Sequence, residues 1–162
     1  MSVNHIISVL VENKAGVLAK ISGLFSRRGF NIESLAVGPT DNNSISRITI
    51  VVNAETHSIE QVVKQLYKLV NVIKIHELDP ANIVERELVL IKVNAENSSR
   101  AEILEIVNIF RANIVDVGKK SLVIEITGNS RKIKGIEELL KPYGIIELVR
   151  TGKVAISRGS KK

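Results

Sequence analysis

The sequence predicts an α+β protein built from two consecutive βαββαβ units, each a ferredoxin-like sandwich with its helices on one sheet face. Three observations lead to this fold class. Strand-like apolar runs and helix-like apolar stripes follow one another in the same order twice along the 162 residues. A proline-containing segment, 79–82, separates the two series, and proline disfavours both a preceding helical residue and a central strand. Each series spans roughly eighty residues, enough for one small core.

The first unit begins with a run typical of a buried strand. Residues 3–11 are rich in β-branched side chains and too few for a typical helix, and the polar turn 12–14 follows them. The segment 15–30 carries one apolar stripe at helical spacing, and its Gly29 is suited to ending a helix. That stripe consists of Val17, Leu18, Ile21, Leu24 and Phe25.

A hairpin, a second helix and a last strand complete this unit. Strands over 31–37 and 45–53 are joined by 39–44, whose Pro, Asp, Asn and Ser residues favour a turn. Helical spacing then returns at Ile59, Val62, Val63, Leu66 and Val70. Residues 70–78 predict the closing strand.

The second unit repeats this order. Residues 86–95 predict a strand, and Ser99 with Glu102 has the spacing of a capping box, in which each side chain satisfies a free backbone N–H. The helix that follows is expected to turn inward Ile103, Ile106, Val107 and Phe110. The remaining elements are a hairpin of strands 113–117 and 122–127 across 118–120, a helix over 130–141 and a strand over 145–149. The inward residues of the last helix are expected to be Ile133, Ile136, Leu139 and Leu140.

The predicted elements set the domain boundaries. We expect a first domain over 1–78, a linker over 79–85, and a second domain over 86–162 that ends in a basic tail. Each domain has a small core and one sheet face without helices to cover it. Edge pairing or face packing with a second copy would hide the exposed edge and the apolar surface, so an oligomer is expected.

The net charge of +6 suggests a polyanionic partner until it is divided along the chain. Residues 1–79 carry 8 basic and 7 acidic side chains, and residues 80–149 carry 10 of each. The remaining +5 comes from Arg150, Lys153, Arg158, Lys161 and Lys162. The body of the protein is therefore nearly neutral, which disfavours a nucleic-acid-binding face.

Composition also limits the chemistry and the compartment. The chain has no cysteine, which excludes disulfides and thiolate chemistry and fits a reducing compartment. The histidines His5, His57 and His76 are far apart and lack the spacing of metal ligands. No apolar run approaches the roughly 20 residues of a membrane helix, and the first residues lack the pattern of a signal peptide. We expect a protein that is not secreted and has no membrane partner, in a bacterial cytoplasm or in the plastid stroma if it is plastid-encoded.

No catalytic pattern stands out. The motifs GxSxG, HExxH and GxGxxG do not occur. Residues 117–121 resemble a phosphate loop only locally, because Asn113 stands where that loop needs its first glycine, so a hairpin turn is favoured. The pair Glu137 and Glu138 lies on a predicted helix and is interpreted as solvated surface. We therefore expect no catalytic, cofactor or metal site in this chain.

The informative segment is ENKAGVL, residues 12–18, between the first strand and the first helix. Free N–H groups and the helix dipole at this point favour a small anion such as an amino-acid carboxylate. Gly16 would let a ligand approach the backbone, and Asn13 offers both a donor and an acceptor. Asn31 could supply a second amide. On residue type alone, a purely structural reading is favoured, in which Asn13 caps the helix and Gly16 relieves its first turn.

The same stretch resembles a known family. Together, ENKAGVL, GLFSRRGFNIESL and the turn from Pro39 followed by Ser46 and Arg47 resemble the N-terminal ACT domain of acetohydroxyacid synthase (acetolactate synthase) small, regulatory subunits. The resemblance continues through VERELVLIKV and RTGKVAISRG and so covers nearly the whole chain. ENxxGVL alone would indicate only an ACT domain, whereas RGFNIESL with the two later segments is more specific.

The resemblance implies a non-catalytic regulatory subunit. It implies binding to the large catalytic subunit, which uses thiamine diphosphate, magnesium and FAD to condense two pyruvates, or pyruvate with 2-ketobutyrate. It also implies activation of that subunit and feedback inhibition by valine, or by leucine or isoleucine. The effector site would lie between two ACT domains of a homodimer. By position, it would be lined by Asn13, Ala15, Gly16, Val17, Leu18, Asn31 and Ile32, with Gln61 a less secure member.

Two other function classes compete with this interpretation. An amino-acid-responsive nucleic-acid-binding or transcription-regulating ACT protein would use the basic tail, yet no helix-turn-helix or aromatic RNA-binding motif is found. A free-standing enzyme would need an active-site constellation, which the sequence lacks. The regulatory subunit is therefore the leading hypothesis.

Overall fold

The computed structural model describes residues 3–159, apart from the side chains of Thr56 and His57. It confirms the expected α+β fold. The described chain forms two compact units. One holds the residues up to Val84 together with the segment from Lys153 onward, and the other is Glu85–Gly152.

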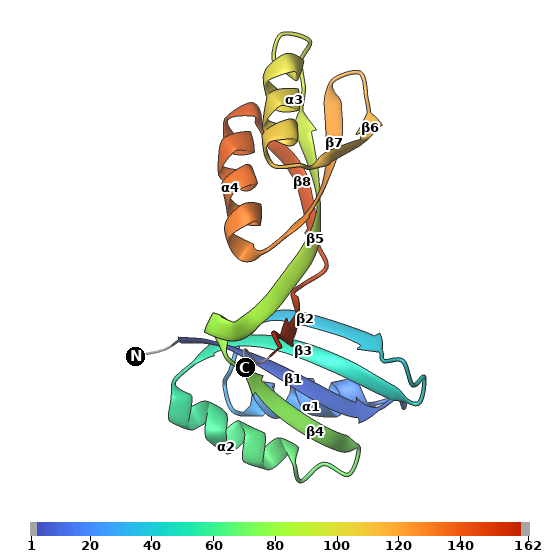
Figure 1. Cartoon of the computed structure of the whole chain (residues 1–162), viewed down its shortest axis with the longest axis vertical. Coiled ribbons are helices and arrows are strands. Elements are labelled where there is room, and N and C mark those ends of the chain that lie inside the picture. The colour runs from blue at the N-terminus through green and yellow to red at the C-terminus, as the bar shows by residue number, and fades with distance from the viewer. Residues whose placement is uncertain (1–2, 160–162) are drawn as a thin grey trace. The chain divides into compact units, whose positions relative to one another are not determined.

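The first unit has the expected βαββαβ order. Its sheet has the strand order β2-β3-β1-β4, and α1 and α2 lie on the same face of it (Figure 1). Its elements are β1 (Val3–Glu12), α1 (Val17–Arg27), β2 (Ile32–Pro39), β3 (Ile45–Ala54), α2 (Thr56–Leu66) and β4 (Val72–Leu78). All neighbouring strands are antiparallel, with Ile7 of β1 opposite Ile50 of β3.

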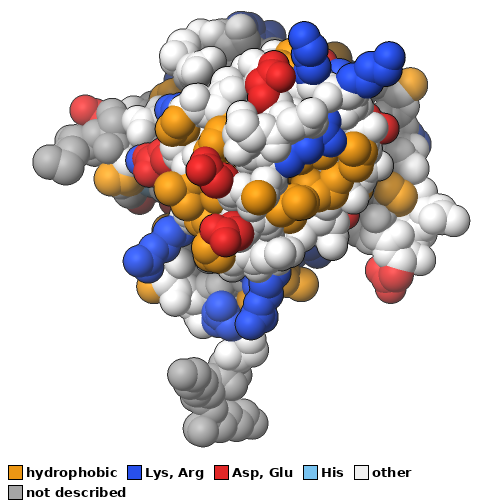
Figure 2. Space-filling view, turned by 90° about the horizontal axis from the view of Figure 1, so that it is seen from above, with side chains coloured by type: hydrophobic (Ala, Val, Ile, Leu, Met, Phe, Trp, Pro, Cys, Tyr) orange, Lys and Arg blue, Asp and Glu red, His pale blue; other side chains and the backbone are white. Residues whose placement is uncertain are grey.

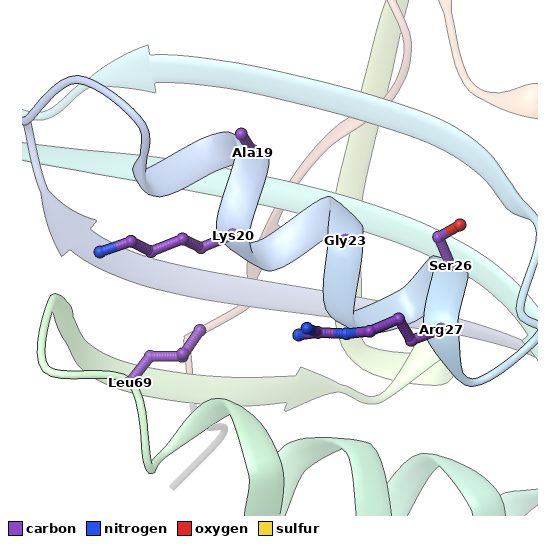
Figure 3. A pocket seen from close by; sticks show the side chains of 6 residues that line it. All are labelled: Ala19, Lys20, Gly23, Ser26, Arg27 and Leu69. Atoms are coloured by element: carbon purple, nitrogen blue, oxygen red, sulfur yellow. The ribbon is translucent and has the colours of Figure 1, made fainter.

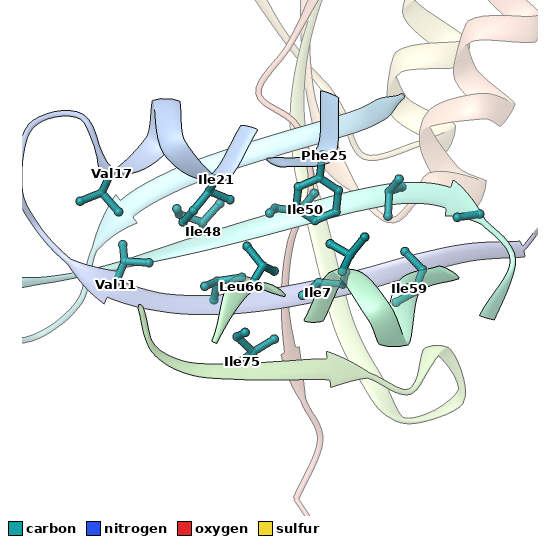
Figure 4. Close-up of a cluster of buried hydrophobic side chains, with 14 residues drawn as sticks. Ile7, Val11, Val17, Ile21, Phe25, Ile48, Ile50, Ile59, Leu66 and Ile75 are labelled. Carbon is teal, nitrogen blue, oxygen red and sulfur yellow. The ribbon is translucent and has the colours of Figure 1, made fainter. Parts of the chain in front are cut away.

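The core of the first unit lies between the sheet and its helices. Alternate residues of the two central strands, among them Ile7 and Ile50, point toward the helices, as the period of two in a strand requires. They meet Ile21 and Phe25 of α1 and Leu66 of α2 (Figure 4). These side chains are fully buried, so most residues of the predicted apolar stripes do form the core, whereas Leu18 of the α1 stripe is 39% exposed.

The opposite sheet face of this unit carries a smaller apolar cluster. It consists of Ile6, Val51, Leu78, Ile83 and Ala155. Ala155 belongs to β9 (Val154–Ser157), a strand that the sequence analysis missed. The segment is anchored on this unit because the Lys153 N–H donates to Ser34 Oγ over 2.8 Å and the Arg158 N–H donates to the Asn82 carbonyl over 2.9 Å.

The observed division of the chain differs from the expected boundaries in two respects. The expected linker 79–85 holds a 3-10 turn, Pro80–Asn82, and the start of β5 (Ile83–Asn94). The segment from Lys153 onward, which was expected in the second domain, groups with the first unit. Burial of Ala155 and the hydrogen bonds of Lys153 and Arg158 explain this grouping.

The second unit repeats the architecture. Its sheet has the order β6-β7-β5-β8, with β9 paired to β5. Besides β5, its elements are α3 (Arg100–Ile109), β6 (Asn113–Val117), β7 (Ser121–Gly128), α4 (Ser130–Leu140), a 3-10 turn (Lys141–Tyr143) and β8 (Ile145–Arg150). Its core brings Val89, Ile91 and Ile124 of the sheet against Ile103 of α3 and Ile136 of α4. The hairpin 113–128 forms as predicted.

Three local expectations are wrong. Helix α2 ends at Leu66, and Val70 beyond it is 90% exposed. Leu139 points to solvent with 48% exposure, although Leu140 beside it is buried. The capping box does not form, because Ser99 has helical rather than extended backbone angles and its hydroxyl donates to the Glu96 carbonyl.

Candidate functional site

The turn between β1 and α1 presents an uncapped helix N-terminus. Gly16 is the N-cap residue, with a left-handed φ of 85°, and no side chain caps the helix. The Val17 N–H donates to the Lys14 carbonyl over 3.5 Å. The next N–H groups of the first turn have no partner inside the helix and remain available to an anion. A Cβ at Gly16 would meet nothing within 4 Å. The glycine is therefore required by its backbone angle, and the space beside it is open.

Asn13 does not cap the helix, contrary to the structural reading of the sequence. Its side-chain amide donates to the Asn43 carbonyl over 2.9 Å, and its backbone N–H donates to the Ser44 carbonyl over 2.8 Å. Both contacts tie this turn to the β2–β3 turn. The side-chain oxygen of Asn13 has no hydrogen-bond partner within residues 3–159 and faces outward with the exposed residue.

A charged pair lies beside the turn. Lys14 Nζ is 2.8 Å from Glu12 Oε2. The hydrogen bond and the charge of Lys14 hold the pKa of Glu12 below its ordinary value, and Glu12 in turn raises the pKa of Lys14. Asn71 also donates to Glu12, over 3.4 Å. The Glu12–Lys14 pair is therefore neutral as a whole. The positive end of the α1 dipole then favours an anion over a cation at this turn.

The other predicted site residues fall into two groups. Ala15 is exposed and Leu18 is 39% exposed, so both border the open side of the turn. Val17, in contrast, is only 4% exposed and packs into the core. Its backbone can line a ligand at the turn, whereas its side chain cannot.

Asn31, Ile32 and Gln61 lie away from the turn in the chain's own fold. Asn31 is exposed and directly precedes β2, beyond the C-terminal end of α1. The 11 residues of α1 span about 16 Å, so the turn and Asn31 stand at opposite ends of that helix. Ile32 packs partly against the core, and Gln61 is exposed on α2. One subunit therefore does not bring all of the predicted residues around one small ligand.

A cleft along α1 was not predicted. It has a volume of about 350 Å³ and is lined by Ala19, Lys20, Gly23, Ser26, Arg27 and Leu69. The side chains of Lys20 and Arg27 extend along the same side of the helix, toward Leu69 (Figure 3). Lys20 and Arg27 are seven residues apart, and positions i and i+7 share one helix face. This spacing is the feature of the sequence from which the cleft could have been predicted.

Other site types find no support within residues 3–159. No group of three or more His, Asp or Glu side chains there could hold a metal ion. No described helix is long and apolar enough to cross a membrane. The face shown in Figure 2 mixes hydrophobic, basic and acidic side chains and presents no continuous basic surface.

The first unit, a βαββαβ sandwich whose first strand passes through this open turn into α1, has the architecture of an ACT domain. The family model "AHAS small subunit-like ACT domain" matches residues 7–74, and "Small subunit of acetolactate synthase" matches residues 86–159. The chain belongs to the acetolactate synthase small-subunit family.

Relatives and a solved structure agree with this assignment. The chain is 56% identical over 158 residues to a probable acetolactate synthase small subunit of Archaeoglobus fulgidus, covering 98% of this chain and 99% of the relative. It is 56% identical over 155 residues to the acetolactate synthase small subunit of Mycobacterium bovis, covering 96% and 92%. The crystal structure of the small subunit from Thermotoga maritima superposes with a TM-score of 0.90 at 43% identity, covering 98% and 99%.

Proposed function

We propose that this chain is the regulatory subunit that activates the catalytic subunit of acetolactate synthase and makes it sensitive to valine. The observation that carries the proposal is the family match in both halves of the chain, residues 7–74 and 86–159. In this proposal the chemistry belongs to the large subunit, which holds the thiamine diphosphate, magnesium and FAD. The small subunit binds the large subunit, and the free energy of that binding depends on whether valine is bound.

Valine would bind where the turn of one subunit meets Asn31 of a second. The uncapped amides of α1 suit the carboxylate, and the free oxygen of Asn13 suits the ammonium group. Because the turn and Asn31 lie at opposite ends of α1, a two-fold axis that places two α1 helices antiparallel would bring them together twice. The site is therefore complete only in a dimer.

Strand β2 supports such a dimer. It lies at an edge of the sheet, and Val37 on it is 49% exposed. Pairing of two β2 edges would satisfy the free backbone groups and cover this apolar side chain. It would also set the starts of the two β2 strands, and hence both Asn31 residues, next to the partner. Edge pairing and effector binding thus share one interface.

Inhibition requires that valine bind two states of the assembly with different affinity. A ligand held between two subunits meets this condition, because a change in the arrangement of the dimer moves the β1–α1 turn of one subunit relative to Asn31 of the other. Valine would then favour the dimer arrangement that activates the large subunit less. The coupling is reciprocal, so the large subunit should also change the affinity for valine.

The direct test measures acetolactate formation by the large subunit. Adding this chain should raise the activity, and valine should then lower it, whereas the large subunit alone should respond less to valine. Gly16→Asp should weaken valine inhibition, because it places a carboxylate where the ligand's carboxylate would bind. Gly16→Ala is the matched control, since it carries the backbone strain without the charge.

Two outcomes would contradict the proposal. The first is the absence of activation at any ratio of the two subunits. The second is full valine inhibition in a Gly16→Asp variant that is folded and still activates the large subunit.

A further inference from the structure

We propose a second ligand site in the first unit, on the sheet face that α1 and α2 leave open, for a small carboxylate with a short hydrocarbon chain. A cleft of about 230 Å³ lies there between β2, β3 and β9. It is lined by Ala36, Val37, Gly38, Pro39, Arg47, Thr49, Val154 and Ala155. All of these residues belong to the same compact unit.

Strand alternation places the polar groups of this cleft away from the proposed valine site. Ile48 and Ile50 of β3 point into the core under the helices. Arg47 and Thr49 alternate with them and so point to the opposite face. The cleft and the β1–α1 turn are therefore separate sites.

Arg47 supplies the positive charge. Its Nη1 donates to Ser8 Oγ over 3.0 Å, which fixes the guanidinium across β3 and β1. Within residues 3–159 no carboxylate pairs with Arg47, and no acidic residue lines the cleft. A guanidinium has five N–H donors, so most remain available for a ligand carboxylate.

Thr49 supplies a second polar group. Its side chain is only 3% exposed and lines the cleft. Within the described part of the chain, every fully buried side-chain oxygen has a hydrogen-bond partner, so the Thr49 hydroxyl is not an unsatisfied buried group. A hydroxyl can both donate and accept a hydrogen bond. In the proposed complex it donates to a ligand oxygen in the cleft while Arg47 holds the charge.

The remaining walls select the rest of the ligand. Ala36, Pro39, Val154 and Ala155 are apolar, and the cleft is smaller than the roughly 300 Å³ at which drug-sized sites begin. Because no carboxylate lines it, an ammonium group would be desolvated without a partner. The cleft therefore favours a monocarboxylate of about five carbons without an amino group, which is a different chemical class from valine.

The test is an NMR titration of the full chain with isovalerate, with uncharged isovaleramide as the probe of matched shape. Isovalerate should shift the backbone amides of Arg47, Thr49 and Ala155, and isovaleramide should bind about tenfold more weakly or worse. Valine should shift Gly16 and Asn31 instead. Failure of the valine titration alone would count against the proposed function and leave this site standing.

Variants separate the site from a general effect on folding. Arg47→Gln should weaken isovalerate binding about tenfold, and Thr49→Val should weaken it less, because it removes one hydrogen bond between neutral and charged partners and leaves the guanidinium in place. Arg28→Gln, which removes an exposed cation outside the cleft, is the matched control and should change nothing. Equal affinity for isovalerate and isovaleramide, or unchanged binding by Arg47→Gln, would overturn the proposal.

Discussion

The backbone angle of Gly16 makes a prediction about stability that can be compared within one helix. Gly16 has a φ of 85°, and Gly23 lies inside α1. A Cβ would meet nothing within 4 Å at either position, so neither alanine variant suffers a clash. Only the backbone preference differs. Gly16→Ala should cost about 1 kcal/mol, because L-residues avoid the left-handed region. Gly23→Ala should stabilise by about 0.5–1 kcal/mol through helix propensity.

The measurement is urea unfolding of the full chain, followed so that only the first unit is observed. The chain has no tryptophan and two tyrosines, so a Tyr143→Phe background leaves Tyr67 as the only tyrosine. Tyr67 reports on the first unit because its hydroxyl donates to the Ile75 carbonyl over 3.1 Å. Linear extrapolation gives the free energy of unfolding for each variant.

The two substitutions should therefore have opposite signs, separated by about 1.5–2 kcal/mol. Gly16→Asn is an informative third variant, since asparagine tolerates the left-handed region better than alanine and should lose less stability. A Gly16→Ala variant as stable as its parent would refute the left-handed N-cap on which the turn depends.

Three further predictions follow from packing and titration. Phe25→Ala should destabilise the first unit by about 3–5 kcal/mol in the same urea assay, because Phe25 is fully buried, and a smaller loss would contradict this core. The Tyr143 hydroxyl donates to Glu102 over 2.7 Å, which raises the pKa of Tyr143, so its contribution to stability is complete below pH about 10 and is lost as pH rises through the folded-state pKa. In a spectrophotometric titration, Glu102→Gln should lower that pKa, and an unchanged value would argue against the contact. A chain that stops after Gly152 should lose stability in the first unit, because removing Ala155 exposes its smaller apolar cluster.

Periodicity was enough to predict the order of the elements. The apolar stripes of α1 and α4 have the period of a helix, and β1 is a short run rich in β-branched residues, as buried strands are, so each element's own residues carry the signal. The exceptions lie at element ends. Leu139 is apolar and one residue from a buried leucine, yet it falls outside the inward stripe.

Strand β9 could not be predicted because its signal is not local. It has only four residues, and what makes it a strand is pairing with β5 and burial of Ala155. The capping box failed for a related reason. The Glu102 carboxylate accepts from Tyr143, which is 41 residues away, and Ser99 has helical backbone angles. Tertiary contacts overrode a local pattern in both cases.

The candidate site shows the same limit. The ENKAGVL segment predicted the turn from strand to helix, because Gly16 and the strand before it are local features, but residue type alone favoured a cap by Asn13 that the helix start does not have. The distance between that turn and Asn31 depends on the length of α1 and on a second subunit, which a single sequence does not show. The cleft beside Arg47 lies between strands far apart in sequence, so no spacing rule points to it.

The central claim is that valine binds between two subunits, and complementation tests it most directly. Asn13→Ala and Asn31→Ala would each damage both sites of a homodimer, lowering valine affinity about tenfold. A mixed dimer of the two variants, isolated with two different tags, would hold one undamaged site and one doubly damaged site. The account predicts one valine bound per mixed dimer at the parental affinity. No recovery in the mixed dimer would place the two asparagines in the same chain's site and contradict the account.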